Sequence, residues 1–189
     1  MLSAPSAPSS LFPSQPHASV NRLLLLLLCS SILQGCSPQA VNFPFDPGGR
    51  SLNSNFSDLQ PRISGRYVVF VSDRSGSQDL YLYDMVMHSL VDLPGLNAID
   101  MIVSSPGILK DGRLIVFAGS REGRSSIYLY DRTTRQLRNL TENLRAEVRN
   151  PTITADGNTI AFESSANGQW DVVLYDQDGQ PLDALTNPR

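Results

Sequence analysis

Short runs of β-branched and aromatic residues alternate with turns along most of the chain. The clearest runs span 67–71, 114–118 and 159–163. Each follows a turn that contains a glycine: Gly65, Gly112 or Gly157. Runs of this kind, bounded by turn residues, are typical of β-strands. An apolar stripe with the 3.6-residue period of a helix is not seen, so the pattern predicts an all-β fold.

Further strands are expected after each of these runs. A second run follows at 80–84, 127–131 and 172–176, after a polar loop that contains a glycine. Weaker strands are predicted at 90–93, 137–140 and 182–185, and another should begin near each of the prolines at 61, 106 and 151. Four short antiparallel strands in about 45 residues form one blade of a β-propeller.

The chain also repeats itself at a nearly constant interval. Three kinds of residue recur at steps of 45 to 47: Pro61, Pro106 and Pro151; Phe70, Phe117 and Phe162; Asp84, Asp131 and Asp176. The sequence therefore predicts three four-stranded blades.

The repeat resembles that of TolB-type propellers. That pattern runs proline, an aromatic residue, Ser-Pro-Asp-Gly, then Ile/Leu-Ala-Phe and a serine, and the stretch from Pro151 to Ser164 is similar to it. The later Ile-Tyr-x-x-Asp and Leu-Thr of the family are matched at 127–131 and 140–141. The aromatic position holds Ile63, Ile108 and Ile153 instead, which we expect to pack between blades. The resemblance implies six blades and a separate N-terminal α/β domain. In this chain we expect three blades and no such domain, so a role in Tol-Pal transport does not carry over.

The first 36 residues differ from the rest. They contain one charged residue, Arg22, followed by about 11 mainly apolar residues, too few to span a bilayer. The run ends in Leu33-Gln34-Gly35-Cys36, which resembles the lipobox of bacterial lipoproteins. We therefore expect a signal peptide at 1–35 and lipidation of Cys36, anchoring the protein in the bacterial envelope facing the periplasm. An ordinary signal sequence is the alternative, and residues 1–19 are suspected to be untranslated, with a start at Val20.

Residues 36–57 are rich in proline, glycine and small polar residues, so we expect the lipidated cysteine to be followed by a tether. The propeller domain should then cover 58–189. From Ser37 onward 14 Lys and Arg stand against 18 Asp and Glu, a net charge of about −4, which disfavours nucleic acid as a partner. Once Cys29 leaves with the signal peptide, no disulfide is expected.

Three blades do not close a ring, because each blade buries both faces against neighbours. We expect a homodimer that forms a six-bladed ring, with two alternatives: an open arc that binds another protein, or a remnant of a longer propeller.

Candidate chemistry is sparse. His88 stands alone, no Gly-x-Ser-x-Gly motif is present, and Asp176 to Gly179 reads as a turn rather than a calcium loop. We expect the repeat aspartates to accept turn amides and Arg74 and Arg121 to be solvated. Trp170 is expected in the core, with a contact residue at the rim as the alternative.

The sequence thus predicts a non-enzymatic binding or scaffolding lipoprotein with no cofactor or metal and with a protein or glycan partner. The alternative is a propeller with a carbohydrate- or peptide-processing site at a dimer interface.

Overall fold

The computed structural model describes residue 46 and residues 48–182, which belong to a compact unit, Phe43–Arg189. The predicted signal peptide and Cys36 lie outside the described residues. The described part contains no helix long and apolar enough to cross a bilayer.

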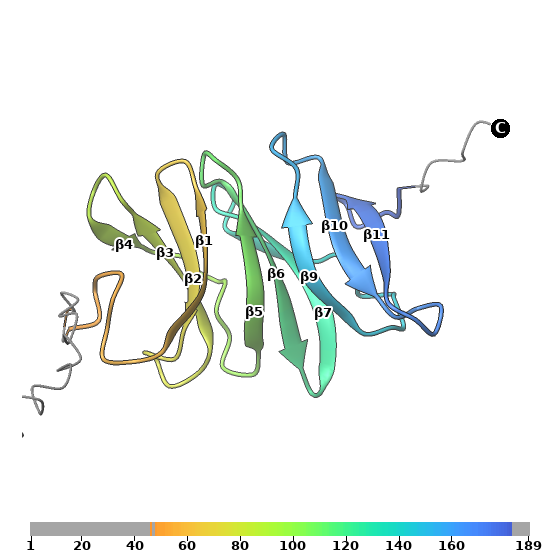
Figure 1. Ribbon diagram of the computed structural model, residues 1–189, viewed down its shortest axis with the longest axis horizontal. Coiled ribbons are helices and arrows are strands. Elements are labelled where there is room, and N and C mark those ends of the chain that lie inside the picture. Colours follow the sequence, from red (N-terminus) through yellow and green to blue (C-terminus); the bar gives the residue numbers. More distant parts are fainter. Residues whose placement is uncertain (1–45, 47, 183–189) are drawn as a thin grey trace, which may run out of the picture. The chain divides into compact units, whose positions relative to one another are not determined.

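Eleven strands form three antiparallel sheets in chain order (Figure 1). Blade 1 consists of β1 (Asp58–Ser64), β2 (Tyr67–Ser72), β3 (Asp79–Asp84) and β4 (Ser89–Val91). Blade 2 consists of β5 (Ile102–Ile108), β6 (Leu114–Arg121), β7 (Arg124–Asp131) and β8 (Gln136–Asn139). Blade 3 consists of β9 (Val148–Ile153), β10 (Thr159–Ser164) and β11 (Asp171–Asp176). The all-β prediction and the three repeats are confirmed.

The fourth strand of blade 3 is only begun in the described residues. Tyr175 forms an isolated antiparallel bridge with Pro181, and the amide of Leu182 donates to the carbonyl of Leu174 at 2.8 Å. The remainder of the strand predicted at 182–185 lies outside the described residues.

The core consists of two apolar layers, one on each side of blade 2. The first joins blades 1 and 2 and includes Val69, Leu82 and Phe117; the second joins blades 2 and 3 and includes Leu129 and Phe162. Blade 2 is therefore packed on both faces. This explains why β6 begins with six consecutive buried residues instead of alternating buried and exposed ones.

The middle strand of blade 3 does alternate. In β10 the residues at 160, 162 and 164 are buried and the intervening ones are half-buried. Blade 2 covers the first set, whereas the second set points to the opposite face of the sheet.

A ring pair recurs between the second and third strand of each blade. Phe70 stacks on Tyr81 with centroids 5.8 Å apart, and Phe117 on Tyr128 at 5.5 Å. In blade 3 Phe162 meets Tyr175 edge to face at 4.9 Å. The position of Tyr81 and Tyr128 is held by Val173 in blade 3, and Tyr175, two residues further along, supplies the ring there.

Candidate functional site

The first strands of the three blades lie side by side. Strand β5 contacts β1 on one side and β9 on the other (Figure 1). Because the repeat step from Pro61 to Pro106 to Pro151 is 45 residues, equivalent positions form rungs across the three strands. These strands sit at the edge of their sheets, and their surface is the candidate site.

Each of the three strands is interrupted by a β-bulge at the same place. The residue before the repeat proline has a positive φ in every blade: 50° at Gln60, 49° at Ser105 and 52° at Asn150. Residues with side chains seldom adopt this conformation, and bulges often stand next to binding sites. The proline that follows suits an edge strand, since it has no N–H to leave unpaired.

The bulge residues are bonded to one another from blade to blade. The amide of Ser105 donates to Gln60 Oε1, and Ser105 Oγ donates to Asn150 Oδ1 at 3.0 Å. Asn150 Nδ2 then donates to Glu163 Oε1 at 3.0 Å. This chain of bonds couples the three first strands and fixes the directions of their polar side chains.

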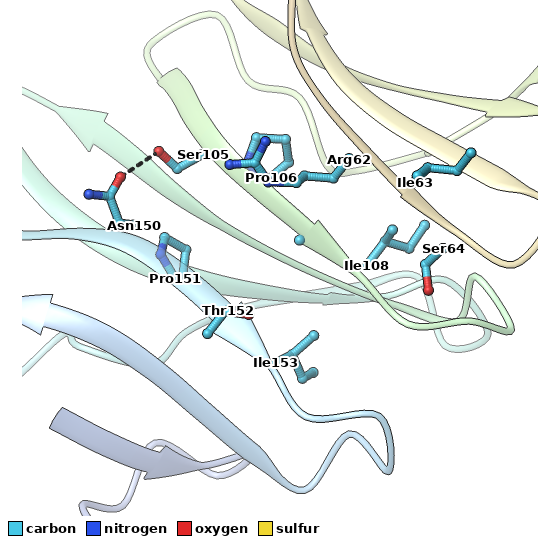
Figure 2. A pocket seen from close by; sticks show the side chains of 11 residues that line it. Arg62, Ile63, Ser64, Ser105, Pro106, Ile108, Asn150, Pro151, Thr152 and Ile153 are labelled. Carbon is cyan, nitrogen blue, oxygen red and sulfur yellow. Dashed lines mark hydrogen bonds between the residues drawn. The ribbon is translucent and has the colours of Figure 1, made fainter. Parts of the chain in front are cut away.

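A groove of about 380 Å³ runs across these strands (Figure 2). Figure 2 shows the bonded pair Ser105 and Asn150 toward one end. The isoleucines of the repeat lie toward the other end: Ile63, Ile108 and Ile153. The groove therefore has a polar end and an apolar end, a division that many ligand sites share.

Between these ends, one rung holds three different residues. It consists of Arg62, Gly107 and Thr152. Gly107 has no side chain, and an added Cβ there would lie 3.1 Å from Val116 Cγ1, so the backbone of β5 packs closely on β6 at this point. Arg62 is the charged residue of the described groove lining, and its Nη1 donates to the carbonyl of Pro61 at 3.1 Å. The rung thus holds a cation on β1 and a hydroxyl on β9, with a residue that has no side chain between them on β5.

The carboxylate of Glu163 ends the hydrogen-bond chain. Hydrogen bonds from Asn150 and then Arg149 lower the pKa of Glu163 below its ordinary value. Arg149 Nε lies 2.6 Å from Glu163 Oε2, and the guanidinium lies 3.8 Å from the ring centroid of Trp170. Trp170 is 45% exposed, so the prediction that it lies in the core is wrong. Trp170 directly precedes strand β11, in which Val172 is exposed.

The repeat aspartates act as predicted. Asp84 Oδ1 accepts the amides of Val86 and Met87, and Asp131 Oδ1 accepts those of Thr133 and Thr134. Asp176 Oδ1 accepts the amides of Asp178 and Gln180. Asp84 and Asp131 also bind an arginine each, Arg66 and Arg113. Their recurrence is explained by turn structure.

Arg74 is not the solvated side chain that the sequence predicts, because its side chain is only 5% exposed. Nη1 donates to the carbonyls of Gly49 at 2.8 Å and Ser51 at 2.9 Å, and Nη2 pairs with Asp58. The guanidinium also stacks on Phe70 and Tyr81. Arg74 therefore holds residues 49–58 against blade 1.

The equivalent residue of blade 2, Arg121, is more open. Its side chain is 40% exposed and lies 3.5 Å from Asp100, and the guanidinium lies 6.0 Å from the Tyr128 ring. His88 is exposed in the turn after β3. Cys36 lies outside the described residues, and the residues that are described hold no cluster of three potential metal ligands.

Sequence reasoning overlooked the bulge residues. A polar residue precedes each repeat proline, namely Gln60, Ser105 and Asn150, but this recurrence alone does not indicate a bulge. Such a residue is biased toward extended backbone. Their positive φ and mutual bonds depend on the stacking of the blades and could not be read from one repeat.

Neither a family model nor a curated protein matches the chain. Solved structures do match. TolB from Acinetobacter baumannii is 25% identical with a TM-score of 0.54, covering 69% of this chain and 32% of that one. The putative TolB from Agrobacterium tumefaciens is 21% identical with a TM-score of 0.52, covering 60% and 40%. The fold is that of a TolB-like β-propeller.

This TolB-like chain spans about a third of the length of the first of these structures. The propeller domain of the Trilobed protease from Pyrococcus furiosus, which has an open velcro topology, is also similar. It is 15% identical with a TM-score of 0.52 and covers 68% of this chain and 42% of that domain. The likeness to a protease shows the fold and not an activity.

Proposed function

We propose that this chain is a cell-envelope lipoprotein that acts as a non-enzymatic protein-binding module, with the groove across β1, β5 and β9 as its binding surface. The observation that carries the proposal is the construction of that groove. Three bulges of equal geometry, bonded through Gln60, Ser105 and Asn150, give a fixed surface with a polar and an apolar end. A preformed surface loses little conformational entropy on binding.

The charge of the groove indicates the kind of segment that fits. The mature chain is acidic, with 14 basic against 18 acidic residues after Ser37, yet the charge in the described groove lining is that of Arg62. Thr152 and Ser105 add hydroxyl groups on the neighbouring strands. An acidic or carboxylate-bearing segment of a partner protein would pair with this cation, with its apolar part toward the isoleucines.

A photo-crosslinking amino acid at Thr152 tests this proposal in cells. We expect the full chain to crosslink to one envelope protein from this position, and the same group at exposed Asn158 to give no such product. Arg62→Glu should reduce the product at least about tenfold, because the cation is replaced by a like charge. Arg145→Glu, an exposed arginine outside the described groove lining, is the matched control. Equal products from Thr152 and Asn158, or insensitivity to Arg62→Glu, would overturn the proposal.

The envelope location rests on the motif that ends in Cys36. Replacing Cys36 with alanine should abolish labelling of the protein by a palmitate analogue and release it from the membrane fraction. Labelling that persists in this variant would refute lipidation at Cys36.

A second candidate is a peptide-processing site, because a protease propeller is among the similar structures. Cleavage of a mixed peptide library by the purified chain would favour this alternative. Uncleaved peptides together with the Thr152 crosslink would favour the binding module.

A further inference from the structure

Blade 1 and blade 2 each carry an arginine four residues after the phenylalanine of the second strand. These residues are Arg74 and Arg121. Both guanidinium groups lie over the tyrosine of the third strand: Arg74 is 4.8 Å from the ring centroid of Tyr81, and Arg121 is 6.0 Å from that of Tyr128. Blade 3 holds Ala166 at this position. The two arginines therefore occupy equivalent places, each against the same ring of its blade.

Arg74 uses all of its donors within the chain. It donates to three backbone carbonyls within four residues: those of Gly49, Ser51 and Leu52. Nη2 also pairs with Asp58, and Nε donates to Ser72 Oγ at 3.0 Å. A guanidinium has five N–H donors, so Arg74 is saturated. Most of its bonds go to the main chain of a segment that has no regular secondary structure.

Arg121 keeps the ring contact but lacks these acceptors. Its Nε is buried without a hydrogen-bond partner among the described residues, and Gly119 stands where blade 1 has Ser72. Asp100 Oδ1 lies 3.5 Å from Nη2, and in the described part of the chain no backbone carbonyl accepts from this guanidinium. The side chain of Arg121 is 40% exposed, against 5% for Arg74. Arg121 thus has a carboxylate neighbour, as Arg74 has in Asp58, but not the carbonyls.

The segment of blade 2 that corresponds to residues 49–52 is bound elsewhere. Residues 94–97 follow residues 49–52 by the repeat step of 45. The carbonyl of Pro94 accepts from the hydroxyl of Tyr130 at 2.8 Å. The side chain of Asn97 exchanges two hydrogen bonds with the backbone of Leu80, at 3.0 and 2.9 Å. This segment therefore fills the interface between blades 1 and 2 and leaves Arg121 open.

A pocket of about 390 Å³ lies beside Arg121. Two arginines and two glutamates contribute to its lining: Arg121, Arg124, Glu122 and Glu142. Ser126 and Tyr128 also line it, and they share one face of β7 with Arg124, which pairs with Arg121 across the strands. Because the charges of this lining cancel, the pocket favours neutral polar groups such as backbone carbonyls over a free anion.

We propose that the pocket beside Arg121 binds an irregular peptide segment of a partner protein through its backbone carbonyls. The occupant is a peptide segment because the equivalent arginine of blade 1 holds one, with three carbonyls on a single guanidinium. Hydrogen bonds from a charged donor are stronger than those between neutral groups. The pocket shares no described lining residue with the groove across β1, β5 and β9, so this proposal does not rest on that of the groove.

A peptide with the sequence of residues 48–57 is a suitable probe, since it contains the three carbonyls that Arg74 binds. Acetylation and amidation of its ends leave it without a carboxylate. We expect the labelled peptide to bind the solubilised full chain with a saturable change in fluorescence anisotropy. Arg121→Ala should raise the dissociation constant at least about tenfold, and Arg121→Lys should also weaken binding because an ammonium lacks the planar fork.

Two arginine variants serve as controls. Arg145→Ala, at an exposed residue outside the described pocket lining, and Arg62→Ala, in the groove, should both leave the dissociation constant unchanged. The second control separates this pocket from the groove. Equal loss of binding in Arg62→Ala would place the probe in the groove and overturn the proposal.

Mapping of the contact completes the test. A photoreactive leucine at the Leu52 position of the probe should crosslink to β6 or β7. Crosslinks confined to blade 1 would show that the probe replaces residues 49–52 on Arg74 and would overturn the proposal. Competition by acetate would indicate an anion site instead, with the same consequence. The proposal also fails if binding does not saturate below about 1 mM or is unaffected by Arg121→Ala.

Discussion

Single residues explain how the first blade is joined to the chain that precedes it. The guanidinium of Arg74 binds three backbone carbonyls between Gly49 and Leu52 as well as the carboxylate of Asp58. Burial raises the pKa of Asp58, but hydrogen bonds from Arg74, Ser72 and Ser54 outweigh it, and the pKa lies below the ordinary 3.8. The ionised form of Asp58 therefore stabilises the folded state.

This gives a prediction for acid pH. Because the pKa of Asp58 is lower in the folded than in the unfolded state, its contribution is fully present above about pH 4 and is lost as the pH falls through the folded pKa. We expect the free energy of unfolding, measured in urea between pH 2.5 and 7, to fall steeply below about pH 4. Asp58→Asn should lower stability at pH 7 and reduce this slope. Equal slopes for the two proteins would contradict this role of Asp58.

The sequence could not identify Arg74 as a buried residue. Its neighbours Ser72 and Ser75 and the following glycine are typical of an exposed turn, which supports solvation. The carbonyls that it binds lie 22 to 25 residues earlier in the chain, in a stretch read as a tether. The role of the repeat aspartates could be predicted, because the turn amides that they accept lie only two to four residues further along the chain. Local contacts can be read from sequence, whereas contacts between distant segments require the fold.

At the level of elements, the turn between the first and second strand of blade 2 fixes how closely that blade approaches blade 1. Gly112 in this turn has a φ of 73°, and an added Cβ would lie 2.4 Å from Cε2 of Tyr67 in blade 1. A side chain at this position would therefore meet both an unfavourable backbone conformation and a ring in the first core layer.

We predict that Gly112→Ala lowers the free energy of unfolding by about 3 kcal/mol, about 1 of which comes from the positive φ. Gly123 is the matched control: its φ is 77° and nothing lies within 4 Å of an added Cβ. Gly123→Ala should therefore cost only about 1 kcal/mol. Urea unfolding of both variants measures the difference. Equal losses would mean that the turn at Gly112 does not contact Tyr67.

The strands could be predicted because each combines β-branched or aromatic residues with a flanking glycine turn. The runs expected at 67–71 and 114–118 correspond to β2 and β6, although β6 extends to Arg121. The bulges of β1, β5 and β9 could not be predicted, since a proline in an edge strand is compatible with regular pairing as well. The bulges shape the groove across β1, β5 and β9, so the sequence could not predict the groove either.

For the molecule as a whole, one apolar position of the repeat is exposed in the first blade and one in the third. Val172 is exposed whereas its equivalents Leu80 and Ile127 are buried, and Ile63 is exposed whereas Ile108 is buried and Ile153 is half-buried. The repeat alone does not indicate this difference. Only the structure shows which residues remain open and that the neighbouring charges are paired.

The central claim is that three repeats stack as blades, with blade 2 covered on both faces. Amide hydrogen exchange measured by mass spectrometry tests it most directly, because protection follows burial and hydrogen bonding. We predict the slowest exchange in β6 and β7, slower exchange in β2 and β10 than in the outer strands β4 and β8, and fast exchange in the turns. Exchange in β6 and β7 as fast as in the turns, or faster than in β10, would contradict the stacked three-blade fold.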